Sequence, residues 1–88
     1  MATVFIPAPL RELTGGRAAV EAAGATVGEL IDDLDRRWPG LRQRLREGDR
    51  LRPNLSVAVD GEISPLGLRE KVPPGAEVHF VAAIKGGA

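Results

Sequence analysis

The chain has no cysteine and no long apolar run, and its charges favour neither sign. The absence of cysteine excludes disulfides, thiolate metal ligands, iron–sulfur ligation and a cysteine nucleophile. No segment approaches the roughly 20 apolar residues that a membrane-spanning helix needs. The start of the chain also lacks the basic segment of a secretory signal peptide. We therefore expect a cytoplasmic protein, with no membrane as a partner, that folds by packing alone.

The charge balance also restricts the class of partner. Lys and Arg together number 12, as do Asp and Glu, whereas binding to nucleic acid or to an anionic membrane needs a basic excess. We expect no nucleic-acid partner. The only histidine, His79, has no Ser, Asp or second His at a spacing that suggests a catalytic triad or a metal site. We therefore expect no catalytic residue and no metal.

Residues 26–38 carry the clearest local pattern, that of an amphipathic helix. Thr26 and Glu29 have the spacing of a capping box, in which each side chain binds the backbone amide of the other residue. Apolar residues recur at helical spacing, and they are Val27, Leu30, Ile31, Leu34 and Trp38. The opposite face carries Asp32, Asp33, Asp35, Arg36 and Arg37, which we interpret as solvated. Pro39 and Gly40 end the helix.

Strand patterns occur on both sides of this helix. β-Branched or alternating apolar residues occupy 3–6, 17–22, 55–59 and 77–82, and a short segment at 62–63 follows a turn. Residues 41–52 predict one further helical turn, with Leu41 and Leu45 facing inward. The arginines of that segment are interrupted by acids and have no aromatic neighbours, so we interpret them as a solvated face.

This order of elements predicts an α+β fold, in which one helix packs on one face of an antiparallel or mixed sheet. Seven apolar side chains would face the helix: Val4, Ile6, Leu55, Val57, Val59, Val78 and Phe80. The other face would carry Thr3, Phe5, Ser56, Ala58, His79 and Val81. An exposed apolar patch on a small domain is typical of a partner surface.

The order, followed by Gly86-Gly87, resembles the β-grasp (ubiquitin-like) fold and, within it, the MoaD/ThiS family of sulfur carriers. The matching stretches are residues 10–16, 25–30, 74–78 and 83–87. The resemblance implies a mixed sheet of four to five strands with one main helix on one face. It also implies a single β-grasp domain over residues 1–88, with a flexible C-terminal tail at 83–88.

The resemblance further implies a carrier that is not an enzyme. An ATP-dependent activating enzyme would adenylate the C-terminal glycine, and a sulfur donor would convert the adenylate to a thiocarboxylate. A synthase would accept the sulfur for molybdopterin, thiamin, cysteine or a thiolated tRNA base. No cofactor would be bound permanently, and ATP would be used by the activating enzyme. As the small subunit of a synthase, the chain would need a larger partner.

The same resemblance assigns roles to residues near the end of the chain. Gly87 would be the residue activated and Gly86 its neighbour, because glycine has no side chain to clash in a narrow ATP site. Candidates for partner contact are Phe5, Ala58, His79, Val81, Ile84 and Lys85.

Ala88 departs from the family pattern, since it places the Gly87 carbonyl in a peptide bond. We expect a protease to remove Ala88 before activation; the alternative for a carrier is that Ala88 is itself activated. Two alternatives remain open from the sequence: a ubiquitin-like modifier joined to lysines, and a β-grasp interaction module that is never activated.

Overall fold

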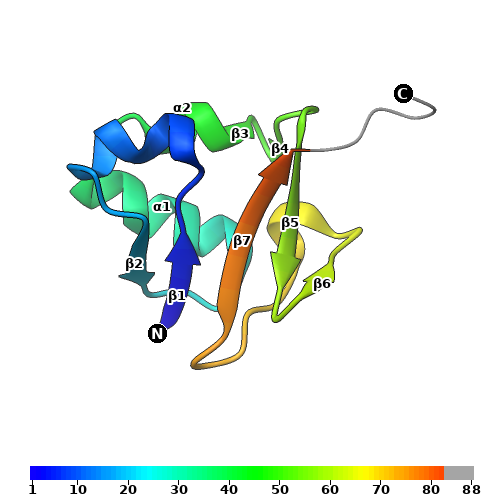
Figure 1. The fold of residues 1–88 in the computed structure, drawn as a ribbon. Helices are drawn as coiled ribbons and strands as arrows, with labels where there is room; N and C mark the ends of the chain where they lie inside the picture. Colours follow the sequence, from blue (N-terminus) through cyan, green and yellow to red (C-terminus); the bar gives the residue numbers. More distant parts are fainter. Residues whose placement is uncertain (83–88) are drawn as a thin grey trace.

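The computed structural model describes residues 1–82, which form a sheet with the main helix on one face (Figure 1). The sheet contains β1 (Ala2–Phe5), β2 (Ala19–Ala22), β5 (Leu55–Val59), β6 (Glu62–Ile63) and β7 (Glu77–Ala82). A separate hairpin is formed by β3 (Arg46–Glu47) and β4 (Arg50–Leu51). The helices are α1 (Val27–Arg37), α2 (Leu41–Leu45) and the two 3-10 helices η1 (Ala8–Thr14) and η2 (Gly67–Arg69).

The strand order is β2-β1-β7-β5-β6, which places the first and last strands of the sheet side by side. β1 and β7 run parallel, and every other neighbouring pair is antiparallel. In the sequence, α1 follows β2 and precedes the remaining strands. In space, α1 covers one face of the sheet. The predicted β-grasp fold, with its mixed sheet and one main helix, is confirmed.

The capping pattern and the apolar stripe both determine where α1 lies. The Thr26 hydroxyl accepts a hydrogen bond from the Glu29 amide at 3.2 Å. The Glu29 carboxylate reaches one residue further back than a standard capping box and accepts from the Ala25 amide at 2.8 Å. The stripe is fully buried at Val27, Leu30, Ile31 and Leu34. Trp38 follows the last residue of α1 and packs half-buried against the core.

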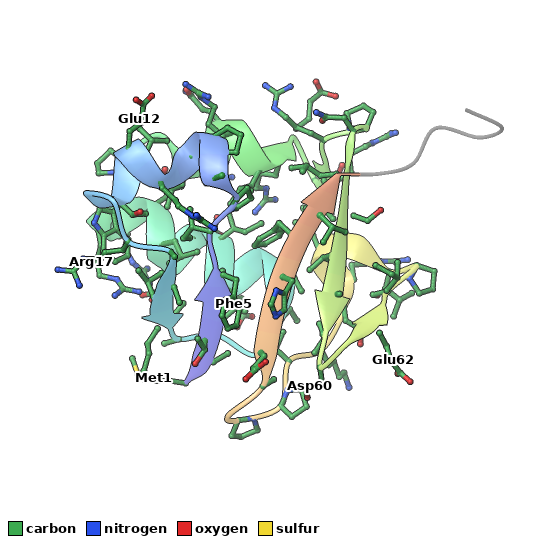
Figure 2. All side chains as sticks on the ribbon, in the orientation of Figure 1. Met1, Phe5, Glu12, Arg17, Asp60 and Glu62 are labelled. Carbon is green, nitrogen blue, oxygen red and sulfur yellow. The ribbon has the colours of Figure 1, made fainter. Side chains whose placement is uncertain are left out.

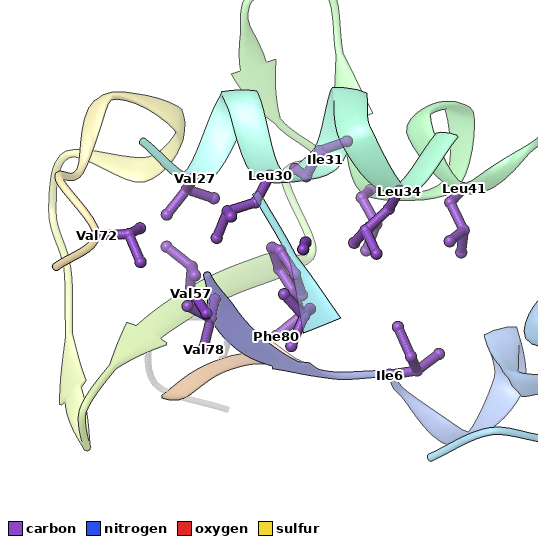
Figure 3. Close-up of a cluster of buried hydrophobic side chains, with 14 of the residues drawn as sticks. Ile6, Val27, Leu30, Ile31, Leu34, Leu41, Val57, Val72, Val78 and Phe80 are labelled. Atoms are coloured by element: carbon purple, nitrogen blue, oxygen red, sulfur yellow. The ribbon is translucent and has the colours of Figure 1, made fainter. Parts of the chain in front are cut away.

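The core fills the space between α1 and the sheet (Figure 3). The sheet contributes the predicted side chains, of which Val4, Ile6, Val57, Val78 and Phe80 are buried and Leu55 and Val59 are partly buried. Leu41 and Leu45 of α2 are fully buried, as predicted. Alternation therefore identified the inner face of the sheet correctly.

Two segments differ from the prediction. The second strand begins at Ala19 and not at residue 17, because the Arg17 amide closes a turn on the Thr14 carbonyl at 3.3 Å. The basic segment after α2 forms the β3–β4 hairpin, which has too few residues on each side to show an alternating pattern. No helix within residues 1–82 is long and apolar enough to span a membrane.

Asp32 is 44% exposed on the outer side of α1, as predicted, but the aspartates of this helix are also bound by other groups. Asp32 lies 3.2 Å from the Arg46 guanidinium. One Asp35 oxygen accepts from the Gly40 and Arg42 amides at 3.0 and 3.1 Å. The two Asp35 contacts fix the turn between α1 and α2. Arg46, the partner of Asp32, belongs to β3, a segment that no local pattern places beside the helix.

Asp33 and Arg37 close part of the free edge of β2. Asp33 accepts from the Ala23 amide at 3.0 Å, and Arg37 donates to the Glu21 carbonyl and pairs with Asp33 at 2.9 Å. β2 is an outer strand, whose unpaired backbone groups could otherwise pair with another chain. The hydrogen bond from Ala23, together with Arg36 and Arg37, lowers the pKa of Asp33 below its ordinary value of 3.8.

We expect Asp33→Asn to lower the free energy of unfolding by about 1 kcal/mol at neutral pH, since Asn keeps the shape but loses the charge. A carboxyl with a depressed folded pKa stabilises the fold above its unfolded pKa, and that contribution disappears as pH falls through the folded value. Urea denaturation of both chains at neutral pH and at several values below 3.8 measures the difference. A difference that stays constant across this acidic range would contradict the assignment.

Candidate functional site

β7 is the strand that leads toward the predicted tail, and it is held on both sides. Val78 and His79 pair with Val4 and Phe5 of β1. On the other side, β5 pairs with β7 along its length, up to the pair of Leu55 with Ala82. The predicted site residues Ile84, Lys85, Gly86, Gly87 and Ala88 lie outside the described residues. The structure thus defines the base from which the tail begins.

The sheet face opposite α1 carries a row of side chains that crosses all five strands. The paired positions are Ala19, Phe5, His79, Ala58 and Ile63, in that order from β2 to β6. Phe5 lies on the face turned to the viewer in Figure 2. Its ring stacks on the His79 imidazole, with centroids 4.1 Å apart and planes 5° from parallel. The two half-buried rings therefore pack face to face and stand together on this face of the sheet.

The other predicted members of this face differ in how much they expose. Ala58 lies next to His79 but is only 7% exposed, so it supports the surface more than it contributes to it. Val81, paired with Ser56, is 38% exposed. Ile63 is 59% exposed and extends the row to the far edge. Sequence reasoning missed Ile63 because a strand of two residues shows no alternation from which its face could be read.

His79 has no catalytic neighbours in the described part of the chain. Its Nε2 lies 3.9 Å from the Glu77 carboxylate, and its side chain is 41% exposed. Within residues 1–82, no group of three or more His, Asp and Glu side chains is placed to hold a metal ion. The arrangement suits contact with another molecule more than chemistry on it, because its main features are a stacked ring pair and exposed aliphatic side chains.

The chain is similar to known proteins along nearly its whole length. The model of the ThiS family matches residues 4–87. The chain is 33% identical to the sulfur carrier protein CysO of Mycobacterium tuberculosis over 90 residues, which cover 97% of each protein.

Two solved structures extend the comparison. A chain in the crystal structure of the Amycolatopsis orientalis BexX/CysO complex is 39% identical, with a TM-score of 0.89 over 99% of this chain and 100% of that one. Small archaeal modifier protein 1 of Haloferax volcanii is 28% identical, with a TM-score of 0.71 over 94% and 97% of the two chains.

Proposed function

The chain belongs to the ThiS family, and we propose that it is a sulfur carrier protein whose C-terminal Gly-Gly is activated by an ATP-dependent enzyme. The observation that carries the proposal is the full-length similarity to CysO, a sulfur carrier protein, which extends into the predicted tail. The chain would be the substrate of the activating enzyme and would have no catalytic residue of its own. A cytoplasmic location, where ATP is available, fits this role.

The proposed reaction has three steps at Gly87. A protease first hydrolyses the bond between Gly87 and Ala88, which frees the carboxylate. That carboxylate then attacks the α-phosphorus of ATP, and diphosphate leaves. Hydrosulfide supplied by the donor attacks the acyl carbon, AMP leaves, a proton is lost, and a thiocarboxylate remains. Gly86 and Gly87 suit these steps because a residue without a side chain can approach a nucleotide closely.

The row of side chains on the sheet face opposite α1, which we call the open sheet face, is the proposed contact with partner proteins. Phe5, His79 and Val81 would pack against the activating enzyme or the sulfur-accepting synthase, with Ile84 and Lys85 entering the same interface. The similarity to a chain of the BexX/CysO complex supports a role in assembly with another protein. A stacked aromatic pair on a regular sheet loses little conformational entropy on binding, which favours such a surface.

The alternative function is that of a modifier, in which the activated Gly87 forms an isopeptide bond with a lysine of another protein. The similarity to small archaeal modifier protein 1 is the observation that favours it. Both functions use the same adenylate and differ only in the nucleophile, which is sulfur for a carrier and an amine for a modifier.

The intact mass of the protein purified from its native cells tests these proposals. We expect a species lighter by one alanine residue, of which a fraction carries sulfur in place of one oxygen. Adducts of higher mass that contain the chain joined to lysine would favour the modifier. A single unmodified species that retains Ala88, under conditions in which the cells make sulfur-containing cofactors, would contradict both and leave an interaction module.

A further inference from the structure

A hollow of about 370 Å³ lies at the end of the sheet from which β7 leads to the tail. Three segments that are far apart in the sequence line it: the start of η1, the α2 helix and the approach to β5. Its lining includes Pro7, Leu10, Arg44, Arg52 and Leu55. Leu55 also pairs with Ala82, the last residue of β7. The hollow thus lies beside the end of β7. Figure 1 shows that β7 ends where β5 begins.

Among residues 1–82, the hollow is lined by two arginines and by no acid, although the chain as a whole is neutral. The neighbouring segments carry both signs of charge: Arg11 and Glu12 on η1, Arg42 on α2, and Arg46, Glu47, Asp49 and Arg50 in the β3–β4 hairpin. The other end of the sheet carries Asp60 and Glu62 (Figure 2), with Lys71 beside them. Composition alone does not show the local excess of positive charge at the hollow.

Some of these arginines already have partners, and of the two at the hollow Arg44 is the more available. Arg46 and Arg42 share Asp32, at 3.2 and 3.6 Å. The Arg52 Nε donates to the Gln43 carbonyl at 2.9 Å, and the Arg52 Nη1 lies 3.5 Å from the Glu47 carboxylate, which is a long distance for an ion pair. Arg44 is exposed and makes no ion pair with any carboxylate of residues 1–82.

We propose that this hollow docks an acidic segment of the enzyme that activates the tail. The inference rests on the proposed function above. Five extended residues, 83–87, could span at most about 17 Å, so an enzyme that reaches Gly87 must approach the end of β7 closely. Its carboxylates would meet Arg44 and Arg52, while apolar side chains would rest on Pro7, Leu10 and Leu55.

Arginine suits this task because its planar guanidinium binds a carboxylate through two parallel hydrogen bonds. Charges at the edge of an interface mainly raise the association rate, and their effect falls as salt is added. The hollow would therefore guide the tail toward the ATP site and reject proteins whose surface is basic, while the open sheet face supplies the apolar contact.

The test uses the chain ending at Gly87 and the activating enzyme purified from the native cells by its ATP-dependent activity, with sodium sulfide as the sulfur source. Initial rates of thiocarboxylate formation are followed by intact mass. We expect Arg44→Glu to raise KM about tenfold or more with little change in kcat, and Arg44→Gln to have a smaller effect. The rate of the wild-type chain should fall with added salt, and that of Arg44→Glu should depend on salt much less.

Arg17→Glu is the matched control, because Arg17 is also exposed and lies outside the hollow. The substitution changes the charge by the same amount as Arg44→Glu. Thermal unfolding of each variant separates a docking effect from a loss of fold. Equal KM values for Arg44→Glu and Arg17→Glu would overturn the docking site but leave the carrier function intact. Absence of thiocarboxylate from the wild-type chain would overturn both. Competition by tRNA that Arg44→Glu removes would identify a nucleic-acid site instead.

Discussion

Removal of both Gly87 and Ala88 is expected to leave the fold intact and to reduce thiocarboxylate formation by at least about a hundredfold. The shortened chain would still end on a glycine carboxylate, but that carboxylate would sit one residue, about 3.3 Å, short of its normal position. A displacement of about 1 Å can cost a hundredfold in rate when two reacting atoms must align. The comparison is with a chain that ends at Gly87, and the measurement is the fraction of each that gains sulfur with ATP and sulfide.

The fold should not change because residues 1–82 already contain the sheet, the main helix and the core between them. Equal melting temperatures for the two chains would establish that the loss is chemical. A third chain, Gly87→Ala without Ala88, keeps the length and adds one methyl group, so it separates the requirement for reach from the requirement for glycine. Normal activation of the chain lacking Gly87 would contradict the carrier proposal.

Local patterns predicted the parts of the fold that depend on local physics. The hydroxyl of Thr26 and the stripe through Leu30 and Leu34 identify α1, because capping and helical periodicity act within a few residues. Period-two alternation identified Val57, Val78 and Phe80 as the inner face of the sheet. The parallel pairing of β1 with β7 joins the two ends of the chain, and it was reached through the family resemblance and not through any local signal.

The parts that sequence reasoning missed depend on contacts between distant segments. Arg46 contacts Asp32, which is 14 residues away in the sequence. A local pattern cannot show such a contact, and the sequence therefore predicted only that both side chains are solvated. Arg44, Arg52 and Pro7 meet at one hollow because β1 ends and β5 begins at the same end of the sheet, on either side of β7. The balanced composition argued against a strongly basic surface, whereas folding brings two arginines and no acid of residues 1–82 to the lining of one hollow. A count of charges does not show such a local excess.

Leu30→Ala is expected to have the largest effect on stability, a loss of about 2–5 kcal/mol in the free energy of unfolding. Leu30 is 0% exposed and points from α1 into the space above the sheet, where Val57 and Phe80 lie (Figure 3). The substitution removes apolar contact and leaves a cavity, since the sheet beneath is paired along its length and cannot easily collapse. Urea denaturation monitored by circular dichroism measures the change.

Arg36→Ala is the matched control on the same helix, because the Arg36 side chain is 74% exposed and its pair with Asp33 is shared with Arg37. We expect it to change the free energy of unfolding by about 0.5 kcal/mol or less. A small domain has a total stability of only about 5–15 kcal/mol, so Leu30→Ala removes a large part of it. If the two variants unfolded at the same urea concentration, Leu30 would not be the central contact between α1 and the sheet.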